Sequence, residues 1–394
     1  MTELLPLPSP YALEISKALE HRIRDEIENS GGWIPFARFM ELALYAPGLG
    51  YYSAGAAKLG TDPEDGSDFT TAPEMTPLFA RALARPIAAI LARSAPEILE
   101  FGAGSGKLAA DLLQELERLD ALPTRYALLE VSADLRERQS ATLALRVPHL
   151  AARLVWLDSM PERIAGVVLG NEVLDAMPVQ CIVRQNDSWC ERGVGLDHRQ
   201  ALAYAIRPAG KALSTAILAA IPNAAGLPDG YLSEIHGAAS AFIHTVVERL
   251  VDDGGTTALF IDYGFPAHEY YHPQRNTGTL MAHYRHRAHG DLLRLPGLQD
   301  LTAHVDFSAI AAAARNAQGR VLGYASQAEF LIDCGIATLL EGTAGDAARW
   351  GPQASALQKL LSEAEMGELF KVIALGKGSV APPGFVHHDR SDAL

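Results

Sequence analysis

The chain has 394 residues, more than one ordinary domain needs, so we expect a main domain with additions. Hydrophobic residues make up 48% of it and charged residues 20%, which is typical of a soluble globular protein and excludes a largely disordered one. The formal net charge of -14 disfavours nucleic acid as a partner, because long-range attraction to phosphates needs the opposite sign. A neutral or basic partner fits better.

The cysteines and the first residues indicate a compartment. Cys181, Cys190 and Cys334 are too few and too scattered for a disulfide framework or a zinc knuckle. The beginning of the chain lacks the pattern of a signal or transit peptide, and no stretch approaches the roughly 18 apolar residues of a membrane span. We therefore expect a cytoplasmic protein without membrane insertion.

The N-terminal part predicts helices and a long loop. Ser9 and Pro10 suit an N-cap and a first helical position, and apolar residues then recur at helical spacing. Residues 46–67 are rich in Gly, Pro and Asp and lack periodicity, and loops of this length are usually functional. The expected helices cover residues 11–27, 35–45 and 77–93, and the loop covers residues 46–67.

From residue 97 onward, short apolar runs alternate with helical patterns. Seven such runs predict an α/β fold, a doubly wound, seven-stranded Rossmann-like sheet covered on both faces. The predicted strands are residues 97–101, 126–131, 154–158, 166–170, 257–262, 301–305 and 369–375.

The spacing of these strands predicts the domain organisation. The gaps after the fourth and fifth strands are longer than a crossover needs, so we expect insertions that shape a substrate site over the carboxyl edge of the sheet. The expected parts are an N-terminal helical and loop segment packing on the core (1–95), the core domain (96–178 and 256–378), a substrate or partner insertion (179–255), a second insertion (264–299) within the core range and a flexible tail (379–394).

The sharpest motif is the glycine-rich turn that follows the first strand. Residues 98–106 read ILEFGAGSG and lead into a predicted helix over 107–119. A P-loop would need glycine where Phe101 stands and Ser or Thr where Leu108 stands, and a dinucleotide fingerprint would need glycine in place of Lys107. The pattern of an acid followed by three alternating glycines instead resembles that of class I methyltransferases.

Two further acids follow the turn at the ends of the next two strands. Glu130 could accept hydrogen bonds from a ribose diol, which suits S-adenosyl-L-methionine as well as NAD. Asp158 resembles the position at which class I methyltransferases contact adenine. The alternative is a purely structural turn, but the agreement of acid, glycines and later acid favours a cofactor. The predicted cofactor-binding residues here are Glu100, Gly102, Ala103, Gly104, Gly106, Glu130, Val131, Asp158 and Asn171.

The segment after the fourth strand, residues 171–178 (NEVLDAMP), stands where class I enzymes place groups that meet the methyl acceptor. It lacks the Asn/Asp-Pro-Pro-aromatic signature of base N-methyltransferases. Glu172 and Asp175, predicted catalytic residues, would share one side of a helical turn and could grip a guanidinium or the ammonium of the cofactor. Arginine stays protonated, so its methylation requires help in removing a proton. The alternative is that these acids cap a following helix.

Two other polar segments carry competing interpretations. Thr71 stands three residues before Glu74, as in a capping box. His283, His286 and His289 have a spacing from which a metal site is conceivable, but no cysteine or carboxylate completes the ligand set. Because methyl transfer needs no metal, we favour solvated or substrate-facing histidines and predict no metal.

Together these residues resemble the MidA-like family, whose mitochondrial members are arginine methyltransferases that assist the assembly of respiratory complex I. The resemblance implies a Rossmann-like methyltransferase domain, S-adenosyl-L-methionine as the methyl donor and a protein arginine as the acceptor, in a complex I subunit or elsewhere. It also implies that Thr71, Pro73 and Glu74 lie near the cofactor. The lack of a transit peptide is typical of a bacterial member. The resemblance rests on residues 44–47, 50–52, 68–74, 100–106, 171–178, 261–264, 278–280 and 300–307.

The predicted mechanism is an in-line attack of a nitrogen on the methyl carbon, with Glu172 orienting or deprotonating the acceptor. Two other functions stay open: a small-molecule methyltransferase, and an assembly factor that binds S-adenosyl-L-methionine without catalysis. A nicotinamide oxidoreductase is the weakest alternative because of Lys107. The oligomeric state, a homodimer included, also stays open.

Overall fold

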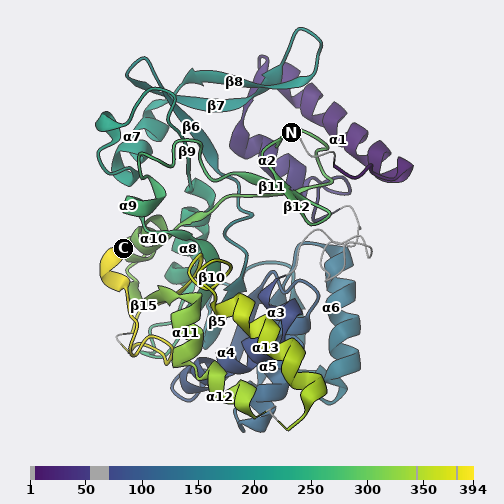
Figure 1. Ribbon diagram of the computed structural model, residues 1–394, viewed down its shortest axis with the longest axis vertical. Helices are drawn as coiled ribbons and strands as arrows, with labels where there is room; N and C mark the ends of the chain where they lie inside the picture. Colours follow the sequence, from purple (N-terminus) through teal and green to yellow (C-terminus); the bar gives the residue numbers. More distant parts are fainter. Residues whose placement is uncertain (1–4, 54–70, 343–344, 379) are drawn as a thin grey trace. The chain divides into compact units, whose positions relative to one another are not determined.

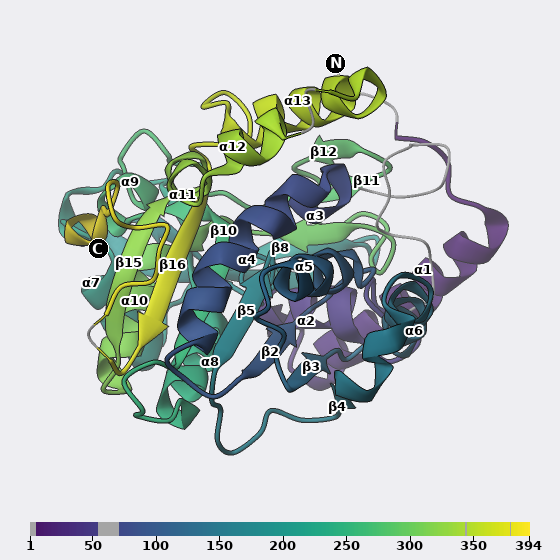
Figure 2. The ribbon, with the colours of Figure 1, turned by 90° about the horizontal axis from the view of Figure 1, so that it is seen from below.

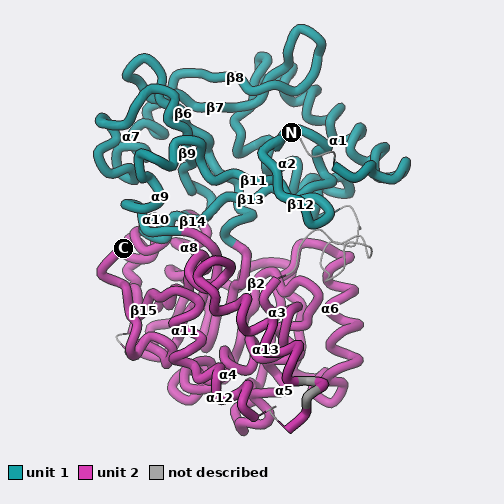
Figure 3. The backbone as a smooth tube through the Cα atoms, viewed as in Figure 1, with its two compact units in different colours: residues 1–69, 174–240, 265–309 teal, residues 70–173, 241–264, 310–394 magenta. Residues whose placement is uncertain are grey.

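The computed structural model describes residues 5–53, 71–342, 345–378 and 380–394. The chain divides into two compact units, shown in Figure 3. Unit 1 comprises residues 1–69, 174–240 and 265–309, and unit 2 comprises residues 70–173, 241–264 and 310–394. In the described ranges no helix is both long and apolar enough to cross a membrane.

Unit 2 is built on a mostly parallel sheet (Figures 1 and 2). Within the unit, the strand order is β15-β16-β10-β5-β2-β3-β4, and only β16 pairs antiparallel with its neighbours β10 and β15. This arrangement confirms the predicted Rossmann-like fold. The strands are β2 (Glu97–Phe101), β3 (Arg125–Leu129), β4 (Leu154–Leu157), β5 (Val167–Asn171), β10 (Thr257–Phe265), β15 (Arg320–Ser326) and β16 (Phe370–Gly376).

One predicted strand is divided into two in the structure. Residues 301–305 divide between β13 (Asp300–Thr302) and β14 (Val305–Asp306), and β13 joins a small sheet in unit 1. The strand missing from the prediction is β15, whose register shifts between Val321 and Gly323. This irregularity and the glycine interrupt the apolar pattern by which a strand is recognised.

Helices cover both faces of the sheet. Figure 2 shows α4 and α5 across one face, where buried residues of the sheet and helices form the main core. On the other face, Phe242 of α8 packs edge-on against Phe101 and Phe260. The helices are α3 (Ala72–Met75), α4 (Pro77–Leu91), α5 (Lys107–Arg118), α6 (Ala133–Arg146), η2 (Pro148–Arg153), α11 (Gln327–Asp333), α12 (Ile336–Glu341), α13 (Ala347–Leu361) and η4 (Ser391–Ala393), with α8 (Gly237–Arg249) and α10 (Phe307–Asn316) each shared with unit 1.

Unit 1 joins the N-terminal segment to both insertions. The short strand β1 pairs with β7, which lies about 160 residues further along, in an antiparallel sheet of order β1-β7-β6-β9 with β8 also on β7. Gly193 permits this pairing, because a Cβ there would lie 2.2 Å from the carbonyl oxygen of Ile34. The elements are α1 (Pro10–Asn29), β1 (Trp33–Pro35), α2 (Phe36–Tyr45), β6 (Gln180–Gln185), β7 (Ser188–Leu196), β8 (Leu202–Pro208), α7 (Lys211–Ala220), η3 (Ala224–Gly226), β9 (Leu232–Ile235), α9 (Ala267–Tyr270), β11 (Met281–Tyr284), β12 (Arg287–His289) and β13.

These units differ from the domain boundaries expected from the sequence. The expected N-terminal segment, residues 1–95, divides at residue 70, and its second part, with α3 and α4, belongs to unit 2. The expected flexible tail instead packs on unit 2: Phe385 is buried against Phe330, and Arg390 forms ion pairs with Glu329 (2.7 Å) and Glu368 (2.8 Å). The polar composition of this segment did not indicate that Phe385 is buried.

Candidate functional site

The glycine-rich turn follows β2 at the carboxyl edge of the sheet, where the strand order reverses: β3 and β4 lie on one side of β2, and β5 and β10 lie on the other. Gly102, Gly104 and Gly106 have φ angles of +62°, +54° and +80°, in the left-handed region that side chains disfavour. A Cβ on Gly106 would lie 3.0 Å from the Cα of Gln139, so glycine lets the turn approach α6 closely. In doubly wound sheets, the point at which strand order reverses is where ligands bind.

Glu100 lies beneath this turn rather than on the surface. Its carboxylate is 2% exposed and accepts a hydrogen bond of 2.8 Å from the Tyr126 hydroxyl on β3. Burial, together with a smaller effect of the charge of Glu130, raises the pKa of Glu100 to about 7, although the hydrogen bond from Tyr126 lowers it. The acid that opens the motif is therefore a buried group with a titration near neutrality.

Glu130 is hydrogen-bonded to Gln139, a residue that was not among the predicted site residues. Its carboxylate accepts hydrogen bonds from the Ser132 amide (2.9 Å) and from Gln139 Nε2 (3.1 Å). The same Gln139 nitrogen donates to the carbonyl oxygen of Gly104 (3.1 Å), and its Oε1 accepts from Trp156 Nε1 (3.0 Å). Gln139 thus connects the glycine turn, the acid of β3 and the strand β4.

A signal for Gln139 was present in the sequence. The buried residues of α6 are Leu135, Gln139 and Leu143, which recur every four residues along one helix face. A polar residue in the middle of an apolar stripe must find hydrogen-bond partners inside the fold. Such a position indicates either a structural network or a site.

Val131 and Asp158 follow the ends of β3 and β4 and lie at the surface. Val131 is 76% exposed, an apolar side chain immediately after the acid Glu130. The Asp158 side chain is 91% exposed and is oriented by an ion pair of 2.8 Å with Arg136, which also donates to the carbonyl oxygen of Leu157. Both residues are therefore available to a ligand at this edge.

The helix α3 contacts the glycine turn, but not through the expected capping box. Thr71 occupies the N-cap position of α3 without a side-chain capping hydrogen bond. Glu74 instead accepts a hydrogen bond from the Ser105 hydroxyl, so it is turned away from the helix end. Lys107 Nζ donates to the carbonyl oxygen of Pro73 (2.6 Å). The first part of this motif, residues 68–70, lies outside the described residues.

The segment after β5 is an irregular turn rather than the expected helical turn. Glu172 has a φ of +52°, rare for a residue with a side chain, and its amide donates to the carbonyl oxygen of Ile261 (2.8 Å). The next amide, of Val173, donates to the Asp262 carboxylate (3.1 Å). These contacts with β10 fix the strained backbone, and residues 172–179 contain no helix for the acids to cap.

Asn171 presents an unsatisfied acceptor at this edge. Its Nδ2 donates to the Glu172 carboxylate (3.1 Å), whereas its Oδ1 is buried without a hydrogen-bond partner among the described residues. A buried polar atom without a partner is costly unless a ligand supplies one. Asn171 Oδ1 therefore fits a donor carried by a bound molecule.

Asp175 belongs to a different environment, in unit 1. It is buried beside Tyr52, whose pKa is raised well above its usual value by burial and by the charges of Asp300 and Asp175, among others. The Tyr52 hydroxyl donates to the Asp300 carboxylate (3.1 Å), and its ring stacks on Tyr45 at 5.5 Å. This cluster unites residues from the segments 44–52 and 300–307, whose roles the sequence did not reveal.

The three histidines lie on a hairpin of unit 1. His283 is on β11 and His289 on β12, and burial lowers the pKa of both. Within the described ranges, no three His, Cys, Asp or Glu side chains are grouped closely enough to hold a metal ion.

A Rossmann-like sheet with an acidic glycine turn, a second acid and an unsatisfied amide at its carboxyl edge can hold a nucleoside bearing an amino-acid group. These features define the class of S-adenosyl-L-methionine-dependent methyltransferases. The family model described as "Putative S-adenosyl-L-methionine-dependent methyltransferase" matches residues 78–325, more than half of the chain. The chain belongs to this family, and its cofactor is S-adenosyl-L-methionine.

Similar proteins agree with this assignment. The chain is 53% identical to a Burkholderia thailandensis protein of the COG1565 superfamily crystallised with S-adenosyl-homocysteine; the match covers 99% of this chain and 100% of that one, with a TM-score of 0.95. It is 30% identical to the mitochondrial protein arginine methyltransferase NDUFAF7 of Mus musculus over 88% of this chain and 81% of that protein. The Caenorhabditis elegans homologue is 28% identical, over 85% and 80% respectively. The predicted MidA-like resemblance and the predicted cofactor are confirmed.

Proposed function

We propose that this protein is a class I enzyme that transfers a methyl group to an arginine side chain of a protein, with a respiratory complex I subunit as the first acceptor to test. The observation that carries the proposal is the likeness to arginine methyltransferases, which extends over 88% of the chain for the mouse protein. An alignment that covers 88% of the chain includes residues of both units, so the likeness is not confined to the cofactor-binding fold.

The carboxyl edge of unit 2 supports a specific placement of the cofactor, which supplies an electrophilic methyl group on sulfonium. Glu130 would accept hydrogen bonds from the ribose hydroxyls, and Val131 and Asp158 would meet the adenine. The backbone from Gly102 to Gly104 and the free Asn171 Oδ1 would hold the amino-acid end. The contacts of Glu74 with Ser105 and of Lys107 with Pro73 support a place for residues 71–74 beside it.

Glu172 is our candidate for the group that handles the acceptor. Its carboxylate is positioned by Asn171 Nδ2, and its backbone is held in a strained conformation of the kind found at functional sites. It would orient the guanidinium and accept the proton that the attacking nitrogen loses as the new nitrogen–carbon bond replaces the methyl–sulfur bond of the donor, which would leave as the thioether. Asp175, in the Tyr52 cluster, stays a predicted catalytic residue, to be tested by Asp175→Asn.

The Glu172→Gln variant tests this role. We expect methyl transfer from radiolabelled S-adenosyl-L-methionine to fall about 100-fold, the usual worth of a general base, with cofactor affinity unchanged. Mass spectrometry of the labelled protein should identify methylarginine. The matched control is Glu162→Gln, an exposed residue of the same unit. Full turnover of Glu172→Gln would remove it from the mechanism, and label found only in metabolites would favour a small-molecule acceptor.

A further inference from the structure

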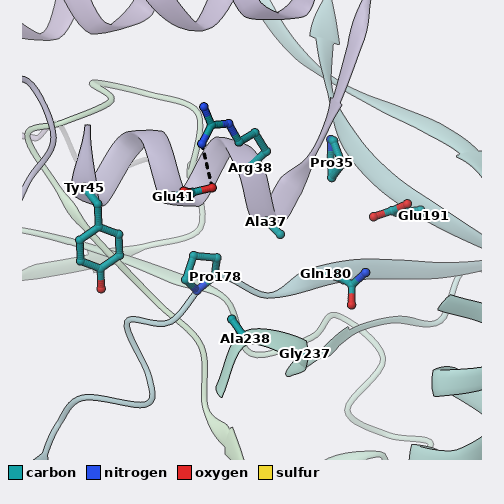
Figure 4. Close-up of a pocket in the computed structure, with 10 residues that line it drawn as sticks. All are labelled: Pro35, Ala37, Arg38, Glu41, Tyr45, Pro178, Gln180, Glu191, Gly237 and Ala238. Atoms are coloured by element: carbon teal, nitrogen blue, oxygen red, sulfur yellow. Dashed lines mark ion pairs between the residues drawn. The ribbon is translucent and has the colours of Figure 1, made fainter. Parts of the chain in front are cut away.

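Unit 1 contains a cavity of about 720 Å³, within the range of ligand-binding sites. It lies between α2, the strands β6 and β7 and the beginning of α8, and Figure 4 shows the side chains around it. One end is aromatic, with Tyr45, and the other carries Gln180 and Glu191. The remaining lining residues are Pro35, Ala37, Arg38, Glu41, Pro178, Gly237 and Ala238.

Glu191 is a half-buried carboxylate for which the described part of the chain provides no counter-ion. It pairs across the sheet with Ile182, so its side chain lies on the same face as that of Gln180, two residues from Ile182 on β6. No described residue forms an ion pair or hydrogen bond with its carboxylate, and burial raises its pKa. Burying part of a charge without a partner is unfavourable, so Glu191 favours a cation in the cavity.

Among the described residues that line the cavity, Arg38 is the one cation, and it is already neutralised. Arg38 forms two hydrogen bonds with Glu26, of 2.5 and 3.0 Å, and an ion pair of 2.9 Å with Glu41. These carboxylates raise the pKa of Arg38, which stays charged. Arg38 is thus neutralised by Glu26 and Glu41, and Glu191 adds a carboxylate to the cavity that no described cation neutralises.

The aromatic end is rigid. Tyr45 donates a hydrogen bond of 2.9 Å to the carbonyl oxygen of Ala176 and stacks on Tyr52, so its ring is fixed in place. With Pro178 it gives an apolar wall, whereas Pro35 lies at the other end, near Glu191. An apolar wall and a carboxylate beside an amide oxygen match a side chain with an aliphatic stem and a planar, charged end.

We propose that this cavity binds an arginine side chain in a basic segment of the protein substrate. Glu191 and Gln180 Oε1 would accept hydrogen bonds from the guanidinium, while Tyr45 and Pro178 pack against the stem. The inference rests on the proposed function only in requiring a protein substrate. It concerns a docking contact, separate from the chemistry assigned to Glu172.

The test is fluorescence anisotropy with the full-length protein and a labelled peptide of three Arg-Gly-Gly repeats. We expect binding to weaken about tenfold in Glu191→Gln, the worth of one charge-assisted hydrogen bond, and about tenfold when citrulline replaces the arginines. Ala238→Trp, at an exposed position, should fill the cavity and abolish binding. Glu14→Gln, an exposed acid on α1, should bind as the wild type does.

The outcomes separate this proposal from the proposed function. Arginine-dependent binding that needs Glu191, in a protein that transfers no methyl group, would support the cavity and refute the function. Methyl transfer to protein with peptide binding indifferent to both Glu191→Gln and citrulline would overturn the cavity. An absence of binding to the wild type would overturn it as well. If Ala238→Trp does not fold, as judged by thermal unfolding, the isosteric Glu191→Gln decides.

Discussion

Single residues at the carboxyl edge of unit 2 show which parts of the site a sequence can reveal. The glycines of the turn were predictable, because only their residue type suits the left-handed backbone that the structure contains. For Gln139 the helical spacing indicates a buried polar residue but not its partners, because Glu130, Gly104 and Trp156 come from three other segments. The strained φ of Glu172 was hidden for a similar reason: contacts from β10 impose it.

Gln139→Ala should destabilise unit 2 and weaken cofactor binding. The change leaves the Gly104 carbonyl oxygen, Trp156 Nε1 and part of the Glu130 carboxylate without a partner, at a cost of about 1–3 kcal/mol in the free energy of unfolding. Urea titrations and calorimetry with S-adenosyl-L-methionine measure both effects. Gln358→Ala, on the exposed face of α13, is the control. Equal free energies of unfolding for the two variants would show that the Gln139 hydrogen bonds do not stabilise the protein.

Glu100 predicts a pH dependence of stability. Its pKa is about 7 in the folded protein against 4.5 for the free group, so the folded state holds the proton more tightly and stability falls as pH rises from 4.5 to 7. Glu100→Gln removes this loss, so the variant should gain about 3 kcal/mol over the wild type at pH 8 relative to pH 4. Urea unfolding at both pH values, with Glu97→Gln as the control, checks it. A difference between variant and wild type that does not change with pH would contradict the buried position of this acid.

Elements were predicted best where the pattern is regular and local. The helix over 107–119 and the first strand over 97–101 correspond to α5 and β2, because an apolar run, glycines and an amphipathic helix succeed one another without interruption. The strand β15 was missed because its bulge and Gly323 break the pattern. Gly323 is required there, since a Cβ would lie 2.3 Å from the ring of Phe385. The close approach of Phe385 to Gly323 thus links the missed strand to the C-terminal segment.

Phe385→Ala tests whether the C-terminal segment is a structural element. The ring is buried against Phe330, and its removal should cost about 3–5 kcal/mol of unfolding free energy, as for other buried phenylalanines. Val386→Ala alters the next residue, which is 70% exposed, and should have little effect. Thermal and urea unfolding compare the two. Similar midpoints would mean that residues 380–394 contribute nothing to unit 2.

At the scale of the whole molecule, the sequence predicted a core with insertions but not their assembly. Unit 1 combines three separate stretches of chain, and its sheet depends on the pairing of Trp33 with Gly195, which no local pattern could indicate. The cavity that we assign to arginine is formed within this unit. Cofactor binding is thus assigned to unit 2 and acceptor docking to unit 1. Variants in the cavity of unit 1 should leave cofactor binding intact, and variants in the glycine turn of unit 2 should leave peptide binding intact.

Calorimetric titration of S-adenosyl-L-methionine into the wild type and Gly104→Val tests the central claim most directly. Valine is strongly disfavoured at the φ of +54° found at Gly104, so the variant should lose the turn and with it at least tenfold in affinity. The control is Gly254→Val, which has a similar φ of +77° in open space elsewhere in unit 2. We predict that the wild type and Gly254→Val bind and that Gly104→Val does not. Binding that is unaffected by Gly104→Val would place the cofactor away from the glycine turn and contradict the account.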